Sequence, residues 1–379
     1  MKGTILKRGN TYSYIVDIGK DPQTGKRKQK TKGGFQRKKD AEAALRKVII
    51  ELDENRYHEP SKESFASYIS RWFFEHYQKR IKDSTVSARW YMIEKHLINE
   101  NPFSEKKLSS ITTKDIDDFY NKKIAENFST NYIRKMHQIL NQSLSQAVKW
   151  QLLAFNPVID SDPPSAKKDE IKIWSFEEIH SFLNVCKKEQ YYLLFLLAFY
   201  TGMRRGELLG LKWRDINIDK RFIQVERSLS YIPKKGYLLT TLKTLNSKRK
   251  VPIPEIIIDE LLIHKKNQNK WKYKLNNQYF DNDLVICTET GSFLDPRNVL
   301  RVMKRICKAA NLKPIRFHDI RHTHASILIS SGVDLVKVSA RLGHANPKIT
   351  LETYAHLIPN DFNEVADIFH NAIQQSKKR

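Results

Sequence analysis

His318 and Arg321 form a pair whose residue types could bind a small anion. They lie three positions apart in residues 316–326, whose pattern predicts the beginning of a helix, so both side chains share one face. A guanidinium fork holds its charge at every physiological pH, an imidazole adds a hydrogen bond, and the first turn of a helix favours negative charge. The pair therefore suits a phosphate.

Four further residues could act together with this pair. Arg204 follows the apolar run Tyr191–Tyr200, which places it where a buried wall meets solvent or substrate. Lys243 lies on a predicted turn, His344 ends a short helical run, and Tyr354 comes ten residues after His344. Taken singly, none is specific, because turn lysines are usually solvated, histidines near helix ends are usually structural, and a lone tyrosine usually packs.

The elements around these residues predict a mixed α/β domain. Residues 221–229, 236–242 and 249–253 are strand-like, and Lys243 falls on the turn between the last two. Ser175 and Glu178 have the spacing of a capping box, which predicts a helix beginning there.

The N-terminal 47 residues predict a small basic sheet backed by a helix. They hold fourteen Lys or Arg against four Asp or Glu. Residues 12–18 alternate apolar and polar types, residues 26–32 form a basic strand that Gly33-Gly34 closes, and helix formers run from 39 to 52. Such a ribbon fits a DNA major groove. A solvated charged hairpin on an unrelated domain is the alternative.

Residues 61–155 predict a helical bundle. Thr112 and Asp115 form a second capping box, and apolar residues between 132 and 148 recur at the spacing of one helix face. Proline-rich residues 156–168 break both periodicities and mark a boundary. The predicted division is 1–60 for the basic sheet and helix, 61–156 for the helical bundle, 157–171 for a linker, and 172–379 for the mixed domain with its tail.

Composition favours a polyanionic partner. The chain carries 67 Lys and Arg against 42 Asp and Glu, a formal charge of +25. Nucleic acid is the favoured partner, because released counterions give basic proteins affinity for phosphates. A basic surface that is merely solvated is the alternative.

The longest apolar run is about half of a membrane span, and the N-terminus is polar. Three separated cysteines form no CxxC pair. We expect no signal peptide, membrane span, disulfide scaffold or cysteine zinc site, and a reducing cytosol.

Taken together and in order, the separated motifs resemble the tyrosine recombinase, or phage integrase, family. The resemblance covers about residues 172–365. It implies a multidomain, mainly α protein with small β-sheets: a β-sheet-plus-helix arm-binding domain, a helical core-binding domain and a mixed α/β catalytic domain. The residues that carry the resemblance are Arg204 after Thr201-Gly202-Met203, Lys243 on a hairpin turn, His318 and Arg321, Leu342-Gly343-His344, and Tyr354.

The resemblance implies a site-specific recombinase that integrates and excises a mobile element, such as a prophage or conjugative transposon. Tyr354 would attack the scissile phosphorus and form a 3′-phosphotyrosine. Arg204 and Arg321 would clamp the non-bridging oxygens. Lys243 would protonate the leaving 5′-oxygen. The ester retains the bond energy, so neither ATP, a metal nor another cofactor is implied.

Supporting roles follow from the same resemblance. His318 and His344 would hydrogen-bond the phosphate, and His318 would also help to remove the tyrosine proton. Glu207 matches an acidic position of the family and would orient its neighbours. The three other nearby histidines are interpreted as packing or hydrogen-bonding residues: His322, His324 and His356.

For the N-terminal segment, the resemblance implies arm-site binding, with contacts from Arg27, Lys28, Gln29, Lys30, Thr31 and Lys32. The implied partners are double-stranded DNA with core-type and arm-type attachment sites, a homotetramer on synapsed DNA, a directionality factor (excisionase) and a host DNA-bending protein. The implied location is the bacterial cytoplasm, at the nucleoid, with no membrane partner. The tail after Tyr354 could pack on its own domain or dock on a neighbouring protomer.

Three other functions fit parts of the pattern. A metal-dependent hydrolase would use a histidine cluster, but no HExxH-type signature accompanies it and the arginines would repel a cation. A non-catalytic DNA-binding regulator would not need the full catalytic set. A type IB topoisomerase shares the chemistry, but it would act as a monomer and would not need a basic N-terminal domain. The histidine cluster would consist of His318, His322, His324 and His344.

Overall fold

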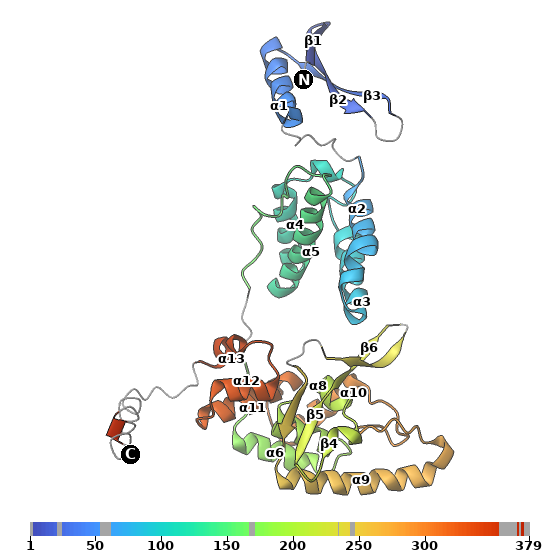
Figure 1. Ribbon diagram of the computed structural model, residues 1–379, viewed down its shortest axis with the longest axis vertical. Coiled ribbons are helices and arrows are strands. Elements are labelled where there is room, and N and C mark those ends of the chain that lie inside the picture. The colour runs from blue at the N-terminus through green and yellow to red at the C-terminus, as the bar shows by residue number, and fades with distance from the viewer. Residues whose placement is uncertain are drawn as a thin grey trace. The chain divides into compact units, whose positions relative to one another are not determined.

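The computed structural model describes residues 3–20, 25–53, 62–166, 171–233, 235–242, 247–355, 370 and 373–374. It divides into an N-terminal unit, residues 1–168, and a C-terminal unit, residues 169–379. Figure 1 labels helices and strands of both units. Lys243 and almost all of the tail after Tyr354 lie outside the described residues.

The N-terminal unit begins with the predicted sheet and helix. Strands β1 (Gly3–Arg8), β2 (Thr11–Lys20) and β3 (Arg27–Phe35) form an antiparallel sheet in that order, and α1 (Lys38–Asp53) packs against it. The predicted alternation is confirmed, because Tyr14 and Val16 are both buried and pack with apolar residues of α1. The buried α1 residues in this cluster are Leu45, Val48 and Leu52.

The predicted end of the basic strand is wrong. β3 continues through Gly33-Gly34 to Phe35, which pairs with Tyr12. The register shifts between Tyr12 and Tyr14, and Gly34 has a φ of 88°. Glycine tolerates the left-handed backbone that such an irregularity requires, so the two glycines bend the strand rather than end it.

The predicted helical bundle is confirmed for residues 65–149. Its capping box at Thr112 and Asp115 is present in both directions. The last helix buries one stripe that includes Met136, Leu140 and Leu144. The elements are α2 (Phe65–Trp72), η1 (Phe73–Tyr77), η2 (Gln78–Arg80), α3 (Asp83–Met92), η3 (Ile93–Asn99), η4 (Leu108–Ser110), α4 (Thr113–Ala125) and α5 (Thr130–Lys149).

In its described residues, the C-terminal unit combines helices with two small antiparallel sheets, of order β4-β5-β8 and β6-β7. The predicted capping box at Ser175 and Glu178 is present at the start of α6. The strands are β4 (Ile216–Asn217), β5 (Phe222–Val225), β6 (Arg227–Ile232), β7 (Gly236–Thr241) and β8 (Arg249–Pro252). The helices are α6 (Phe176–Cys186), α7 (Tyr192–Thr201), α8 (Arg205–Leu209), η5 (Trp213–Asp215), α9 (Glu255–Leu275), η7 (Asn276–Gln278), α10 (Pro296–Ala309), α11 (Phe317–Ser330), α12 (Leu335–Leu342) and α13 (Pro347–Tyr354).

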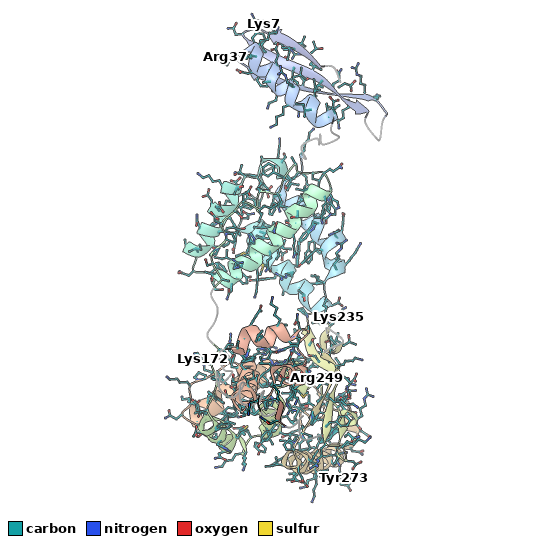
Figure 2. The ribbon with its side chains drawn as sticks, turned by 60° about the vertical axis from the view of Figure 1, so that its left-hand side comes forward. Lys7, Arg37, Lys172, Lys235, Arg249 and Tyr273 are labelled. Carbon is teal, nitrogen blue, oxygen red and sulfur yellow. The ribbon has the colours of Figure 1, made fainter. Side chains whose placement is uncertain are left out.

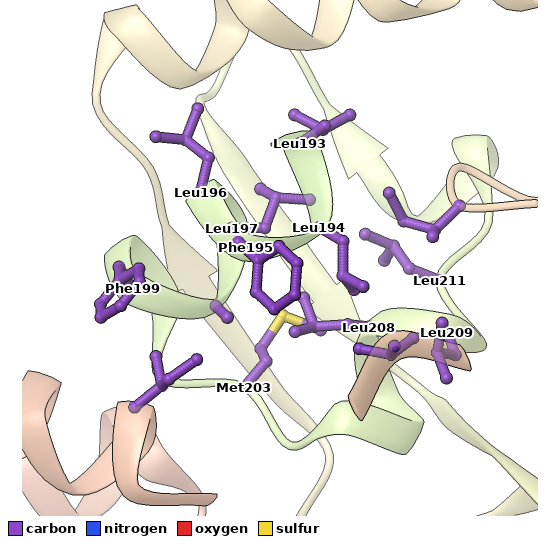
Figure 3. Packing of buried hydrophobic residues seen from close by; sticks show 14 of the residues in the cluster. Leu193, Leu194, Phe195, Leu196, Leu197, Phe199, Met203, Leu208, Leu209 and Leu211 are labelled. Carbon is purple, nitrogen blue, oxygen red and sulfur yellow. The ribbon is translucent and has the colours of Figure 1, made fainter. Parts of the chain in front are cut away.

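Helix α7 lies at the centre of the core of the C-terminal unit. It is apolar on every side, and residues 193–199 are all buried (Figure 3). It contacts α6, α8, α9 and α11. It ends at Gly202, which adopts the left-handed conformation with φ 62°. A helix with most of its side chains buried has little freedom to shift, so the chain that leaves it, including Arg204, is held in place.

Candidate active site

Arg204 caps the short helix α8, directly after the chain leaves α7. Its backbone N–H and its Nη1 both donate to the carboxylate of Glu207, at 3.0 and 2.8 Å. The Glu207 side chain is 1% exposed, whereas that of Arg204 is 38% exposed. The carboxylate therefore fixes the backbone and one nitrogen of Arg204, and it leaves part of the guanidinium open to a ligand.

A second arginine, Arg249 of β8, holds the other side of Glu207. Its Nη2 donates to Glu207 Oε2 at 2.9 Å, and its Nε donates to the carbonyl of Arg341 at 2.7 Å. Burial opposes the charge of Glu207, but Arg249 and Arg204 outweigh that effect and keep the pKa of the carboxyl below its usual value. Arg249 lies inside the unit, whereas Tyr273 is almost fully exposed (Figure 2).

Arg321 joins the two loops that flank the site. It is 3% exposed and donates to the carbonyl of Gly202 at 2.8 Å and to that of Leu342 at 2.6 Å. Burial and the neighbouring charge of Arg204 lower the pKa of Arg321 to about 9, so it stays protonated at neutral pH. One guanidinium on α11 thus holds the loop before Arg204 and the end of α12.

His344 follows the left-handed Gly343 at the end of α12, and its Nδ1 lies 2.8 Å from Thr350 Oγ1. Desolvation and the nearby arginines lower the pKa of His344 to about 4. His318, in the first turn of α11, has more than a third of its surface exposed; burial of the rest of the ring, together with positive neighbours, also lowers its pKa to about 4. Both rings are neutral at physiological pH and offer hydrogen bonds rather than charge.

Tyr354, the last residue of α13, is 2% exposed. Burial raises the pKa of its phenol to about 12. Its hydroxyl lies 2.6 Å from Nδ1 of His322, and its ring belongs to a small apolar cluster with residues of α11 and α12. Helices α11, α12 and α13 lie together in the C-terminal unit (Figure 1).

The structure therefore brings together five of the predicted residues from separate segments of the C-terminal unit. These are Arg204, Glu207, Arg321, His344 and Tyr354, linked directly or through shared loops and helices. His318 lies one helical turn before His322, with 4.9 Å between their ring centroids. The predicted hairpin around Lys243 is wrong, because β7 pairs with β6 and β8 pairs with β5. Lys243 itself belongs to the connection between β7 and β8 and lies outside the described residues.

Two residues of the site were not predicted from the sequence. Arg249 alternates with Val251 on β8, and both face inward. That spacing of two in a strand-like run was the available signal for a buried arginine. Arg341 donates to His324 Nε2 and to the carbonyl of Tyr200. Nothing in its local sequence distinguishes it from a surface arginine at a helix end.

The predicted arm-site residues lie along β3. Side chains 27, 29, 31 and 32 are exposed, and Lys28 and Lys30 are half-buried. Arg27 donates from Nε to Asp17 Oδ2 at 2.5 Å, and Asp17 in turn accepts from the backbone N–H of Gly19. These bonds lower the pKa of the Asp17 carboxyl. The exposed face of β3 therefore presents cations together with Gln29 and Thr31.

Two features bear on the other functions considered. In the described parts of the chain, no three His, Cys, Asp or Glu side chains group closely enough to hold a metal ion. His324, one of the histidines of that hypothesis, bonds instead to the carbonyl of Phe199 and to Arg341. No helix within the described ranges is long and apolar enough to cross a membrane.

Three segments of the chain match known protein families. Residues 173–360 match the phage integrase family, residues 4–52 match an arm DNA-binding domain, and residues 64–124 match the N-terminal SAM-like domain of phage integrases. The chain is 34% identical over 380 residues to a tyrosine recombinase XerC-like protein of Caldanaerobacter subterraneus subsp. tengcongensis, covering 94% of this chain and 95% of the relative. It is 30% identical to the ICEBs1 integrase of Bacillus subtilis, covering 94% and 96%.

Solved structures share the fold. The Tn1549 transposon integrase in complex with a circular intermediate DNA aligns with a TM-score of 0.70 at 17% identity, covering 81% of this chain and 99% of that one. A lambda integrase tetramer bound to a Holliday junction aligns with a TM-score of 0.55 at 20% identity, covering 92% and 94%.

The chain belongs to the phage integrase family. It is a tyrosine recombinase, an integrase of the kind that mobile elements carry. The predicted fold class, with a small arm-binding sheet, a helical domain and a mixed catalytic domain, is confirmed.

Proposed function

We propose that this recombinase cuts and rejoins double-stranded DNA with Arg204, Arg321, His318, His344, Lys243 and Tyr354 as its catalytic residues and Glu207 as a supporting residue. One observation carries the proposal: the buried guanidinium of Arg321 bonds to the loops that hold Arg204 and His344, on the same helix that packs beside Tyr354. A phosphate is the ligand that such a cationic site fits.

The charges support an anionic substrate. Arg204, Arg249 and Arg321 lie around Glu207, which supplies a buried carboxylate. An excess of fixed guanidinium charge in a partly desolvated site stabilises the additional negative charge of a pentacoordinate phosphorus. The protein builds this field before the substrate binds, so little reorganisation is needed during the reaction.

In the proposed step, Tyr354 Oη forms a bond to the scissile phosphorus while the bond to the 5′-oxygen breaks. Lys243 gives that oxygen its proton, and Arg204 and Arg321 hold the non-bridging oxygens, with hydrogen bonds from His318 and His344. Attack by the 5′-hydroxyl of a partner strand reverses the reaction. The 3′-phosphotyrosine keeps the bond energy, so ATP is not consumed.

The functional division follows the predicted boundaries. We assign arm-type DNA to residues 1–60, with contacts from the exposed side of β3, core-type DNA to residues 61–156, and chemistry to 172–379. The solved DNA complexes of the Tn1549 and lambda integrases support DNA as substrate, and the lambda tetramer supports a homotetramer on synapsed sites. A directionality factor (excisionase), a host DNA-bending protein and a place at the bacterial nucleoid complete the proposal.

A covalent-adduct assay tests the proposed function. The probes are nicked duplexes tiled across both ends of the element that carries the gene. The wild-type chain should give an adduct that survives denaturation, and peptide mapping should place the DNA on Tyr354. Tyr354→Phe should bind the same duplexes nearly as well, because phosphate contacts supply the affinity, but it should give no adduct.

Chelation separates this chemistry from metal-dependent cleavage. Adduct formation should be the same with and without EDTA, because guanidinium groups do the electrostatic work. An adduct at wild-type level in Tyr354→Phe, or cleavage that stops with EDTA and returns with zinc or magnesium, would contradict the assignment.

A further inference from the structure

The hydroxyl of Tyr354 contacts a histidine that the roles above leave unused. His322 Nδ1 lies 2.6 Å from Tyr354 Oη, and the two rings are tilted by 51° with centroids 5.8 Å apart. We propose that His322 is the general base of strand cleavage, taking the phenolic proton onto Nδ1 as Oη attacks phosphorus. This inference rests on the proposed function, because it concerns the nucleophile of that reaction.

Packing on α11 fixes this contact. His322, Ala325 and Ile329 follow one another at spacings of three and four on α11, and Ala325 and Ile329 belong to the apolar cluster that surrounds the Tyr354 ring. Val338 and Leu342 of α12 complete that cluster. The tyrosine is therefore held by its ring, and its oxygen is left directed at the imidazole.

His318 is less well placed for this task. It lies one turn earlier on α11, its ring meets that of His322 edge to face, and its side chain is exposed. The ring that the structure places on the nucleophilic oxygen is that of His322. His318 is thereby free to hydrogen-bond the phosphate, which its exposed side chain can reach.

The surroundings keep His322 able to accept a proton. Burial is the main cause that lowers the pKa of His322. The positive charges of Arg316 and Arg321 lower this pKa further, whereas the negative charge of Asp319 raises it. A neutral imidazole whose Nε2 carries the hydrogen presents a lone pair at Nδ1. The titratable and charged groups around it are His318, Asp319, Arg316 and Arg321 of α11 and its N-terminus, His344 of the α12–α13 loop, and Tyr354 of α13.

Proton transfer must accompany bond formation. Burial raises the pKa of the phenol to about 12, and the pKa of the imidazole is lowered from its ordinary value, so Tyr354 stays protonated until attack begins. As the Oη–P bond forms, the oxygen becomes an ester oxygen and its proton grows acidic, so that Nδ1 can take it. The proton moves from Oη to Nδ1, the P–O5′ bond breaks, and the 5′-oxygen takes a proton from Lys243. Religation returns the proton from Nδ1 to Oη.

His322→Asn tests this role, because its amide oxygen offers an acceptor near the position of Nδ1 but cannot take a proton. The assay is the rate of adduct formation by the full chain on the nicked duplexes described above. We expect His322→Asn and His322→Ala to be slower by about 10²–10⁴-fold at neutral pH. The wild-type rate should fall as pH drops through the pKa of His322, whereas the variants should lose that limb and gain rate with rising pH. His180→Asn, an exposed histidine on α6, is the matched control and should behave as wild type.

A more acidic nucleophile supplies the decisive comparison. Fluorinated tyrosine at position 354 ionises more readily, so it should restore most of the rate to His322→Asn and change the wild-type rate little. A merely structural role for His322 would not respond to the acidity of the phenol. Rates within threefold of wild type in both variants, or the same deficit with both nucleophiles, would overturn the proposal. If the wild-type chain gives no adduct on Tyr354, the proposed function itself fails.

Discussion

Replacing Arg249 by methionine should destabilise the C-terminal unit more than the loss of an ordinary ion pair. The change removes hydrogen bonds to Glu207 Oε2 at 2.9 Å and to the carbonyl of Arg341 at 2.7 Å. Removing one partner of a buried ion pair costs about 3–5 kcal/mol. Glu207 keeps its bonds to Arg204, so we expect the lower end, about 3 kcal/mol. For a domain of this size, that is a fall in Tm of about 6–12 °C.

Calorimetric unfolding of the full chain would measure this loss as a shift in the transition of the C-terminal unit. Lys248→Met is the matched control, because the neighbouring Lys248 pairs with Glu226 at 3.4 Å while 52% exposed. Exposed pairs contribute about 0–1 kcal/mol. The double variant Arg249→Met with Glu207→Gln should recover part of the loss, since no buried carboxylate is left short of a partner. Equal shifts for Arg249→Met and Lys248→Met would refute the reasoning.

Three further changes test other parts of the molecule. Gly202→Ala places a Cβ 2.7 Å from His324 Cδ2 at a φ of +62°, and it should cost about 2–5 kcal/mol in calorimetry; unchanged stability would show that the α7 end relaxes freely. Lys243→Ala should slow adduct formation on normal DNA by about 10²–10⁴-fold, but much less on DNA with sulfur at the 5′-bridging position; equal slowing would make Lys243 a phosphate ligand. Deleting residues 1–55 should preserve adduct formation on short core duplexes and abolish recombination of full-length sites, and normal recombination would reduce β3 to a solvated hairpin.

Local patterns in the sequence predicted most of the elements, but the single strand expected over 221–229 is wrong, because these residues divide between β5 and β6, which belong to different sheets. Both capping boxes form, because the required side chains and backbone groups lie within three residues of each other. The alternation at Tyr14 and Val16 identified the buried face of β2. Gly33-Gly34 misled the prediction, because glycine pairs end strands and also permit bulges, and only pairing with Tyr12 decides between these outcomes.

The chemistry of the site was predictable only through the order of its motifs. Arg204, Arg321 and Tyr354 are unspecific one by one, and their convergence depends on how α7, α11 and α13 pack. His322 stood beside the predicted pair but was interpreted as an ordinary hydrogen-bonding residue. Its contact with Tyr354 depends on the position of α13 against α11, because the two residues are 32 positions apart in the sequence. Information of that kind lies in tertiary packing and not in local spacing.

The burial of Tyr354 limits unintended cleavage in a genome full of phosphodiester bonds. With 2% of its surface exposed, Tyr354, the proposed nucleophile, is hidden from any DNA backbone that merely collides with the protein. Random contact with chromosomal DNA then leaves no nick, because the DNA must first reach a hydroxyl that the surrounding side chains cover. For an enzyme whose intermediate is a severed strand, selectivity can reside in this access as well as in the reading of bases. Mutations that loosen α13 would then be toxic to a host before they were detrimental to recombination.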